Sequence, residues 1–228
     1  MTYKILIIDP HPQSLKTLVD LFTQAGYDVM AASDADLGLK MALNHSLDAI
    51  FIELLLPKTS GLNVLKSIRS QSNIPIIILS DQEETLSRRL AFKMGADDYI
   101  EKPCDPQELL EGLHAILRRS NSPAITPQRP TIKYDEIVVD CAKRSVFLND
   151  QQLELTNTEF NILEILIRSK GQAFSKEELT EYALGRKFTA YDRSIDVHIS
   201  NLRNKLGNNT NDEPWVKTVR GFGYMFNE

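Results

Sequence analysis

The chain has 228 residues, of which 42% are hydrophobic and 25% are charged, and its formal net charge is −5. These values are typical of a water-soluble globular protein of one large or two ordinary domains, and they argue against an indiscriminate nucleic-acid binder. Two cysteines without a C-x-x-C motif exclude a disulfide framework, and no apolar run approaches the roughly 18–20 residues that span a bilayer. We therefore expect a cytoplasmic protein with no signal peptide and no membrane partner.

The first 120 residues alternate short apolar runs with helical patterns. Between the runs, apolar residues recur at helical spacing, as at Leu15, Leu18 and Phe22 before Gly26. This alternation predicts an α/β doubly wound domain with a parallel five-stranded sheet, whose site lies at the carboxyl ends of the strands. The predicted strands are residues 5–8, 29–32, 49–52, 76–79 and 99–100.

One of these runs ends in an isolated acid. In the stretch AIFIELLLPKTSG, Glu53 is the one acidic residue, and it follows the predicted strand 49–52 directly. The local interpretation is a strand end whose carboxylate points into solvent. The alternative is a functional carboxylate at the edge of the sheet.

Residues 121–131 form a predicted linker, because the stretch SNSPAITPQRP at residues 120–130 is polar, rich in proline and without periodicity. Residues 132–228 then form a predicted α+β domain. Apolar runs at 137–140, 145–148 and 152–155 indicate an antiparallel sheet. Capping boxes at Thr156 and Ser175 begin two helices, and Asp192 caps a third. A glycine-containing hairpin over 216–226 closes the chain.

The third helix of this domain has two distinct faces. Ile195, Ile199, Leu202 and Leu206 form one apolar stripe, and the opposite face carries Arg193, Val197, Ser200 and Asn204, with Asp196, Asn201 and Arg203 on its shoulders. Residues 186–220 contain seven basic and four acidic residues, a local excess of positive charge. A solvated helix face is the simpler interpretation. Three capped helices followed by a basic hairpin favour a winged helix-turn-helix.

At this point the chain resembles the OmpR/PhoB-type response regulators. The matching stretches are LTNTEFNILEILIRSKGQAFSKEEL, DRSIDVHISNLRNKL and VKTVRGFGYMF, which extend over nearly all of residues 155–226. The resemblance implies that this domain binds double-stranded DNA, with the third helix in the major groove and Arg220 of the wing in the minor groove. It also implies that the loop Leu184–Tyr191 contacts RNA polymerase.

The base-reading positions depart from several family members, which carry arginines where this chain has Ser200 and Asn201. Because arginine pairs with guanine and asparagine with adenine, Asn201 and Asn204 predict adenine-containing half-sites, with Val197 against thymine methyl groups. Phosphate contacts are expected from a second group of residues, Arg193, Arg203, Lys205 and Thr218.

The first domain resembles the receiver of the same family through KILIIDPHP, DAIFIELLLP, IPIIILS, GADDYIEKP and the closing LRR. The resemblance places Glu53 at the phosphoacceptor position, which is normally an aspartate. Ser80 and Lys102 match the phosphoryl-binding positions, and Tyr99 matches the aromatic residue that changes rotamer on activation. Asp9 matches the first magnesium-binding acid, but Pro10 replaces the second and offers no side-chain oxygen.

These departures predict an impaired magnesium site and no useful phosphorylation. Magnesium needs near-octahedral oxygen ligands, and the longer arm of Glu53 displaces its oxygens by about an ångström, which can cost on the order of a hundredfold in rate. The sequence leaves two roles open for Glu53: it imitates an acyl phosphate by reaching Lys102 and Ser80, or it is vestigial in a dimerisation module. Two alternatives for the whole protein are a partner- or ligand-gated regulator and a conventional switch phosphorylated at Glu53.

The resemblance also implies a homodimer through the receiver. The candidate dimer face comprises Arg88, Leu90, Asp97, Asp98, Glu108, Leu109, Leu113 and Arg118. Because exposed ion pairs contribute roughly 0–1 kcal/mol each, an apolar patch around Leu90, Leu109 and Leu113 is expected to decide pairing. Cys104 is expected to be a small buried residue, with redox or ligand sensing as the alternative. The pattern predicts no catalytic residues, no enzyme activity, no cofactor and no metal.

Overall fold

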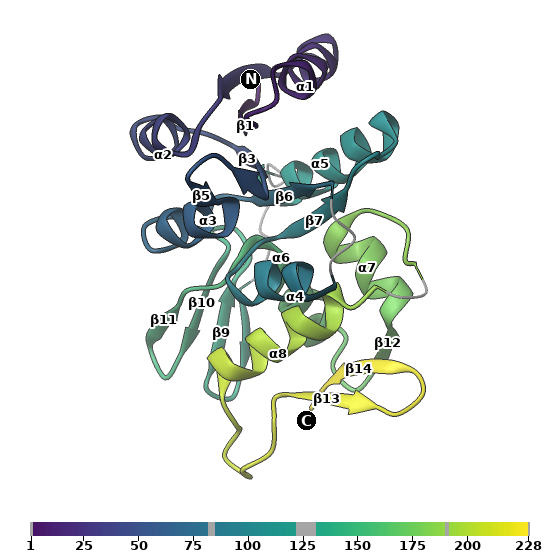
Figure 1. The fold of residues 1–228 in the computed structure, drawn as a ribbon. Coiled ribbons are helices and arrows are strands. Elements are labelled where there is room, and N and C mark those ends of the chain that lie inside the picture. The colour runs from purple at the N-terminus through teal and green to yellow at the C-terminus, as the bar shows by residue number, and fades with distance from the viewer. Residues whose placement is uncertain (1, 82–84, 122–130, 190–191, 228) are drawn as a thin grey trace. The chain divides into compact units, whose positions relative to one another are not determined.

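The computed structural model describes residues 2–81, 85–121, 131–189 and 192–227 (Figure 1). The chain divides into two compact units, Met1–Leu110 and Glu111–Glu228. The division falls inside α5 (Pro106–Asn121), ten residues before the predicted end of the first domain at residue 120. Most of the predicted linker lies outside the described residues.

The first unit contains the predicted parallel five-stranded sheet, in the order β2-β1-β3-β6-β7. Its interior strands β1, β3 and β6 are almost entirely buried, because helices cover both faces of the sheet. The strand predictions are confirmed to within about one residue at most ends: β1 Lys4–Ile8, β2 Asp28–Ala32, β3 Ala49–Glu53, β6 Ile76–Ser80 and β7 Asp98–Glu101.

Local capping chemistry sets where several helices begin. The side chain of Asp34 accepts from the backbone of Leu37, and that of Ser60 accepts from Leu62, each satisfying a free N–H of a first turn. A short hairpin that the sequence did not predict, β4 (Leu55–Leu56) with β5 (Thr59–Ser60), begins two residues after Glu53. The helices are α1 Pro12–Gln24, α2 Ala35–Asn44, α3 Gly61–Arg69, α4 Thr85–Lys93 and α5.

Among its described residues, the second unit contains two antiparallel sheets and three helices that follow the end of α5. Its first sheet has the order β11-β10-β9-β8, and its second has the order β12-β14-β13. The sequence did not predict β8 or β12, and the strand expected at 152–155 ends earlier. The elements are β8 Ile132–Tyr134, β9 Ile137–Asp140, β10 Ser145–Leu148, β11 Gln151–Leu153, α6 Asn157–Arg168, β12 Ala173–Ser175, α7 Lys176–Leu184, α8 Ser194–Leu206, β13 Val216–Val219 and β14 Gly223–Phe226.

Both predicted capping boxes are present, at Thr156–Glu159 and at Ser175–Glu178. Asp192 acts one residue outside the N-cap of α8, where its carboxylate accepts from the backbone and the hydroxyl of Ser194.

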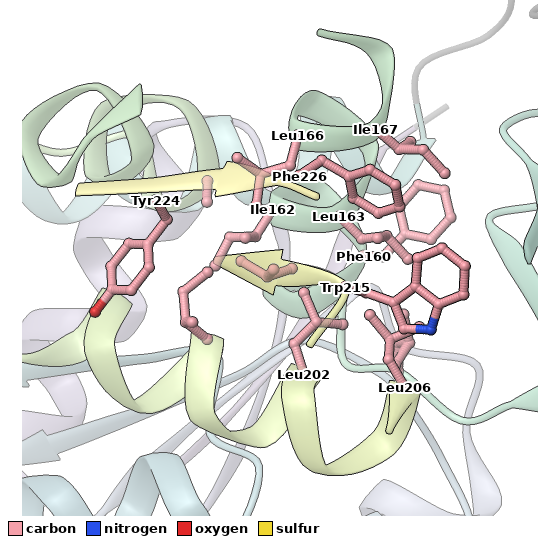
Figure 2. Packing of buried hydrophobic residues seen from close by; sticks show 14 of the residues in the cluster. Phe160, Ile162, Leu163, Leu166, Ile167, Leu202, Leu206, Trp215, Tyr224 and Phe226 are labelled. Carbon is pink, nitrogen blue, oxygen red and sulfur yellow. The ribbon is translucent and has the colours of Figure 1, made fainter. Parts of the chain in front are cut away.

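The core of this unit packs α6 and α8 against the C-terminal hairpin (Figure 2). Trp215 stacks on Phe226 with ring centroids 5.8 Å apart, and Tyr134 meets both rings edge-on. The predicted stripe of Ile195, Ile199, Leu202 and Leu206 is buried, so the orientation of α8 predicted from periodicity is confirmed.

Candidate functional site

Four predicted side chains converge at the carboxyl edge of the parallel sheet. Asp9 follows β1, Glu53 ends β3, Ser80 ends β6 and Lys102 follows β7. Asp9, Glu53 and Ser80 are at most 1% exposed. The local interpretation of Glu53 as a solvent-facing strand end is therefore wrong, because its carboxylate is buried and accepts from the backbone of Leu55.

Lys102 connects the two carboxylates. Its Nζ lies 2.5 Å from Glu53 Oε2 and 3.1 Å from Asp9 Oδ2, and the lysine side chain is 14% exposed. Burial alone would lower the pKa of the ammonium. The hydrogen bond to Glu53 and the negative charges of Glu53 and Asp9 outweigh this effect and raise the pKa above its ordinary value. The group is therefore a fixed cation at neutral pH.

Asp9 has two further partners that the sequence did not identify. Ser14 Oγ donates to Asp9 Oδ2 at 2.7 Å, and the backbone N–H of His11 donates to Oδ1 at 2.8 Å. Burial acts to raise the pKa of Asp9, yet these two hydrogen bonds and the charge of Lys102 lower it below the ordinary value. Ser14 lies in the first turn of α1. Its position just after Asp9 in the sequence was the signal that could have identified it as a partner of this carboxylate.

The ion pairs of Lys102 engage the two carboxylates that a magnesium ion would require at this site. Magnesium binds hard oxygen ligands in octahedral geometry, whereas here an ammonium lies between the two carboxylates that would have to provide them. Pro10 adds no side-chain oxygen. No cluster of three or more His, Cys, Asp or Glu side chains suited to a metal occurs among the residues that the structure describes.

Tyr99 lies in the interior on β7, with 1% of its surface exposed, and burial is the main cause that raises its pKa. Arg88 of α4 lies over its ring at 5.7 Å and also pairs with Glu101 at 3.2 Å. Cys104 is half-buried, so the prediction of a buried residue is wrong in degree.

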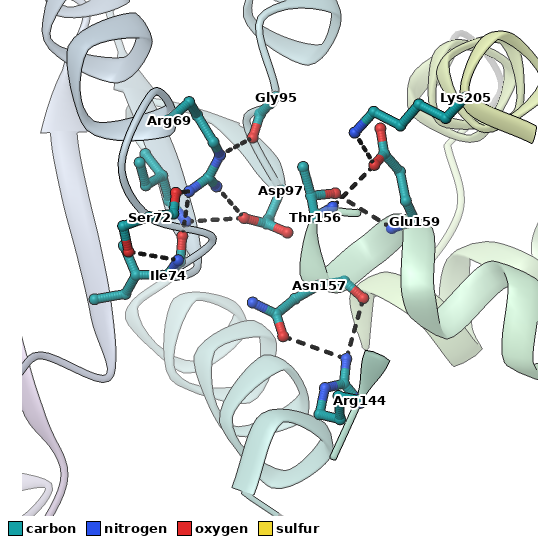
Figure 3. A network of polar contacts seen from close by, with 11 residues as sticks. Arg69, Ser72, Ile74, Gly95, Asp97, Arg144, Thr156, Asn157, Glu159 and Lys205 are labelled. Carbon is teal, nitrogen blue, oxygen red and sulfur yellow. Dashed lines mark hydrogen bonds and ion pairs between the residues drawn. The ribbon is translucent and has the colours of Figure 1, made fainter. Parts of the chain in front are cut away.

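The predicted dimer face needs correction at four positions. Leu109 and Leu113 are each 2% exposed and cannot form an exposed apolar patch, because both are buried in the core. Asp97 is buried and accepts from Arg69 Nη2 at 2.6 Å and from the backbone of Ile76 (Figure 3). Asp98, 1% exposed, accepts from the backbone of Tyr99.

Two apolar residues of α4 are exposed instead. Leu90 is 44% exposed, and Leu86, which was not predicted, is 76% exposed one turn earlier. The side chains of Glu108 and Arg118 lie outside the described residues.

In the second unit, the polar face of α8 has the predicted residues. Arg193, Ser200, Asn204 and Lys205 are exposed, and Val197, Asn201 and Arg203 are half-buried at its margins. Thr218 and Arg220 are exposed on the hairpin. The sequence therefore placed these side chains on one surface of α8 and on the wing.

All four predicted phosphate-binding residues make contacts within the protein, although Arg193, which lies 3.4 Å from Asp196 Oδ2, keeps a side chain that is 67% exposed. Lys205 Nζ lies 2.6 Å from Glu159 Oε2, a buried carboxylate that also caps α6 (Figure 3). Arg203 donates to the carbonyl of Val216 at 2.7 Å and to Thr218 Oγ1 at 2.8 Å. These contacts brace α8 against α6 and the hairpin, and the sequence offered no signal for them.

An ion pair connects the two ends of the loop that is expected to contact RNA polymerase. Arg186 Nη1 lies 2.5 Å from Asp192 Oδ2. Burial raises the pKa of Asp192, but the charge and hydrogen bonds of Arg186 and Ser194 lower it overall. Residues 190–191 of the loop lie outside the described residues.

Comparisons with known proteins agree with this architecture. Residues 5–114 match the response regulator receiver domain, and residues 150–226 match the family described as transcriptional regulatory protein, C terminal. The chain is 37% identical over 226 residues to the transcriptional regulatory protein CpxR of Escherichia coli K12, covering 97% of each chain. It is 35% identical to the alkaline phosphatase synthesis transcriptional regulatory protein PhoP of Bacillus subtilis, covering 100% of this chain and 98% of that one.

Among solved structures, the response regulator DrrB, a Thermotoga maritima OmpR/PhoB homolog, matches 100% of both chains with 25% identity and a TM-score of 0.53. No helix in the described part of the chain has both the length and the apolar character to cross a membrane. A receiver domain followed by a winged-helix transcription-regulator domain, together with full-length relatives of this identity, shows that the chain belongs to the OmpR/PhoB-type response regulators.

Proposed function

We propose that this protein is a sequence-specific, DNA-binding transcription regulator whose receiver works without aspartyl phosphorylation. The observation that carries the proposal is the position of Lys102, whose ammonium contacts both Glu53 and Asp9. The family resemblance implies that residues at these positions normally bind a magnesium ion and a phosphoryl group. Here the protein's own side chains satisfy one another, which supports a receiver that is complete as translated.

Glu53 is the residue that supports imitation of the phosphorylated form. Its longer side chain reaches Lys102 at 2.5 Å, while its other oxygen accepts from the backbone of Leu55 at 3.2 Å. The imitation is partial, because a carboxylate carries one charge and a phosphoryl group about 1.5–2. Burial of Tyr99 in the same unit agrees with a single working conformation.

Output would come from the second unit. Asn201 and Asn204 of α8 would read adenine-containing half-sites, with Val197 against thymine methyl groups, and Arg220 would enter the minor groove. Selection of guanine-rich sites from a random DNA pool would contradict this base preference. Leu184–Tyr191 would contact RNA polymerase, and a homodimer would form through the exposed Leu86 and Leu90 of α4. These roles require binding and no catalysis, in the cytoplasm.

The test compares phosphate analogues with changes at Glu53. We expect acetyl phosphate or beryllofluoride with Mg²⁺ to leave the mass, the oligomeric state and the DNA affinity of the full chain unchanged. We expect Glu53→Ala to lower both the dimer fraction and the DNA affinity, because Lys102 loses its nearest anion. Glu53→Gln is the matched control, since it keeps the length and removes the charge.

The outcomes separate the alternatives. A mass gain together with DNA binding that requires it would identify a conventional switch at Glu53. DNA binding by wild type that is unaffected by Glu53→Ala would identify a vestigial pocket. Binding that appears only after cell extract is added would identify a partner- or ligand-gated regulator.

A further inference from the structure

Asp196 is an acid on the helix that would face DNA. It lies on α8 one position before Val197, and its side chain is 23% exposed. An anion at this position repels the phosphate backbone, so on electrostatic grounds alone it should weaken binding to DNA. Its presence therefore requires a compensating role within the domain.

Its contacts provide that role. Lys176 Nζ, from the first turn of α7, lies 2.7 Å from Oδ1 and 2.9 Å from Oδ2. The hydroxyl of Tyr224, on β14, donates to Oδ1 at 2.7 Å. Arg193, at the start of α8, lies 3.4 Å from Oδ2. One carboxylate thus gathers groups from both helices of the helix-turn-helix and from the wing.

The electrostatics agree with a permanent anion. Burial raises the pKa of Asp196, but hydrogen bonds from Lys176 and Tyr224, followed by the charge of Lys176, lower it below the ordinary value. Burial and this same carboxylate raise the pKa of Tyr224, so its hydroxyl keeps its proton and remains a donor.

A second contact braces the same pair of elements. Arg203, two turns further along α8, bonds to Val216 and Thr218 of β13, and its guanidinium lies 5.6 Å from the ring centre of Tyr224. The wing is therefore attached to α8 at two points, through β14 at Asp196 and through β13 at Arg203. Arg220, at the turn between these strands, is positioned by both.

We propose that Asp196 is a positioning residue for DNA binding, which fixes the wing and Lys176 relative to α8 so that Arg220 and α8 engage adjacent grooves together. The proposal rests on the proposed DNA-binding function. Asp196 does not contact DNA in this account; it determines where the cations that do so are placed.

The decisive experiment is Asp196→Asn in the full chain, because the two views predict opposite signs. Removing an anion from a DNA-facing helix should strengthen binding if charge alone acts. Loss of the charge-assisted bonds to Lys176 and Tyr224 should instead weaken binding roughly tenfold at constant salt. Glu177→Gln is the matched control: it removes the same charge from an exposed neighbour on α7, and we expect binding equal to or slightly tighter than wild type.

Tyr224→Phe provides a second, milder probe, since it removes one hydroxyl and keeps the ring in the core. We expect Tyr224→Phe to bind DNA more weakly than wild type. In hydroxyl-radical footprinting, we expect Asp196→Asn and Tyr224→Phe both to lose protection at the minor groove of the site, while protection around the major groove persists. Arg220→Ala should then weaken Asp196→Asn much less than it weakens wild type. A merely structural role would lower the melting temperature without this coupling.

The outcomes are distinguishable. If wild type shows no sequence-specific footprint, the proposed function fails. If wild type gives a footprint and Asp196→Asn binds as tightly or more tightly, or its effect adds fully to that of Arg220→Ala, the positioning role of Asp196 is overturned.

Discussion

At the scale of single residues, the distinguishing feature is one ammonium shared by two buried carboxylates. Lys102 contacts Asp9 and Glu53, which are at most 1% exposed. Removing charges from water is costly, so such a cluster persists only when each member has a partner. Removing the ammonium of Lys102 leaves two buried anions without their ion pair, and the effect should be large.

We therefore predict that Lys102→Met destabilises the first unit by about 3–5 kcal/mol at pH 7. The lowered pKa of Asp9 means that its contribution is present above pH 3.8 and is lost as pH falls through the folded value. The raised pKa of Lys102 means that its contribution is complete below pH 10.5 and is lost as pH rises through the folded value. The deficit of the variant should hence be largest between these limits and shrink below pH 3.8.

Hydrogen exchange of β1 and β3 amides in the full chain measures this deficit. Lys93→Met, at an exposed position of α4, should change it by no more than about 0.5 kcal/mol. Equal protection in Lys102→Met and wild type at pH 7 would show that the ammonium does not stabilise the site.

At the scale of elements, the wing depends on two glycines for different reasons. Gly221 has φ of 73°, a left-handed conformation that the turn between β13 and β14 requires. Gly223 permits close pairing, because a Cβ at this position would lie 2.0 Å from the carbonyl oxygen of Phe174 on β12. That neighbour is backbone, which cannot move aside as a side-chain end would.

Gly223→Ala should consequently separate β12 from β14 and cost at least about 1–3 kcal/mol. Gly112→Ala is a useful comparison, since a Cβ there meets nothing within 4 Å in the middle of α5. It should stabilise the chain by about 0.5–1 kcal/mol. Calorimetry of the full chain measures both changes, and a melting temperature raised by both substitutions would contradict the close approach at β12.

At the scale of the whole molecule, DNA affinity should depend on how many cations are available to phosphates. Arg193 has a side chain that is 67% exposed, whereas Lys205 is held by the buried Glu159 at 2.6 Å. Arg193 and Lys205 are thus expected to differ in function, because Lys205 already neutralises the buried carboxylate of Glu159.

The salt dependence of DNA binding distinguishes these two residues. Each phosphate contact contributes a slope of about 0.9 in log K against log salt. We predict that Arg193→Ala reduces the slope by about this amount per bound protomer, whereas Lys205→Met leaves it unchanged and lowers the stability of the second unit. A reduced slope for Lys205→Met would instead support the phosphate contact of Lys205 that the sequence predicted.

The sequence by itself determined the kinds of domain, most strands, both capping boxes and the buried stripe of α8. These features depend on local rules: hydrophobic period, cap chemistry and turn residues act over a few neighbouring positions. The residues of the receiver pocket and of the polar face of α8 were named from motifs. The pocket residues come together because the order of the strands brings the ends of β1, β3 and β6 to one edge of the sheet.

Only the tertiary structure decided which of those residues contact one another. Lys102 meets Asp9 across 93 positions, Arg69 meets Asp97 across 28 and Lys205 meets Glu159 across 46. Such pairings, and the burial of Leu109, depend on the packing of helices against sheets, which sequence spacing does not encode. A charged side chain is available to a ligand only when no buried partner claims it, and that partner is chosen by the fold.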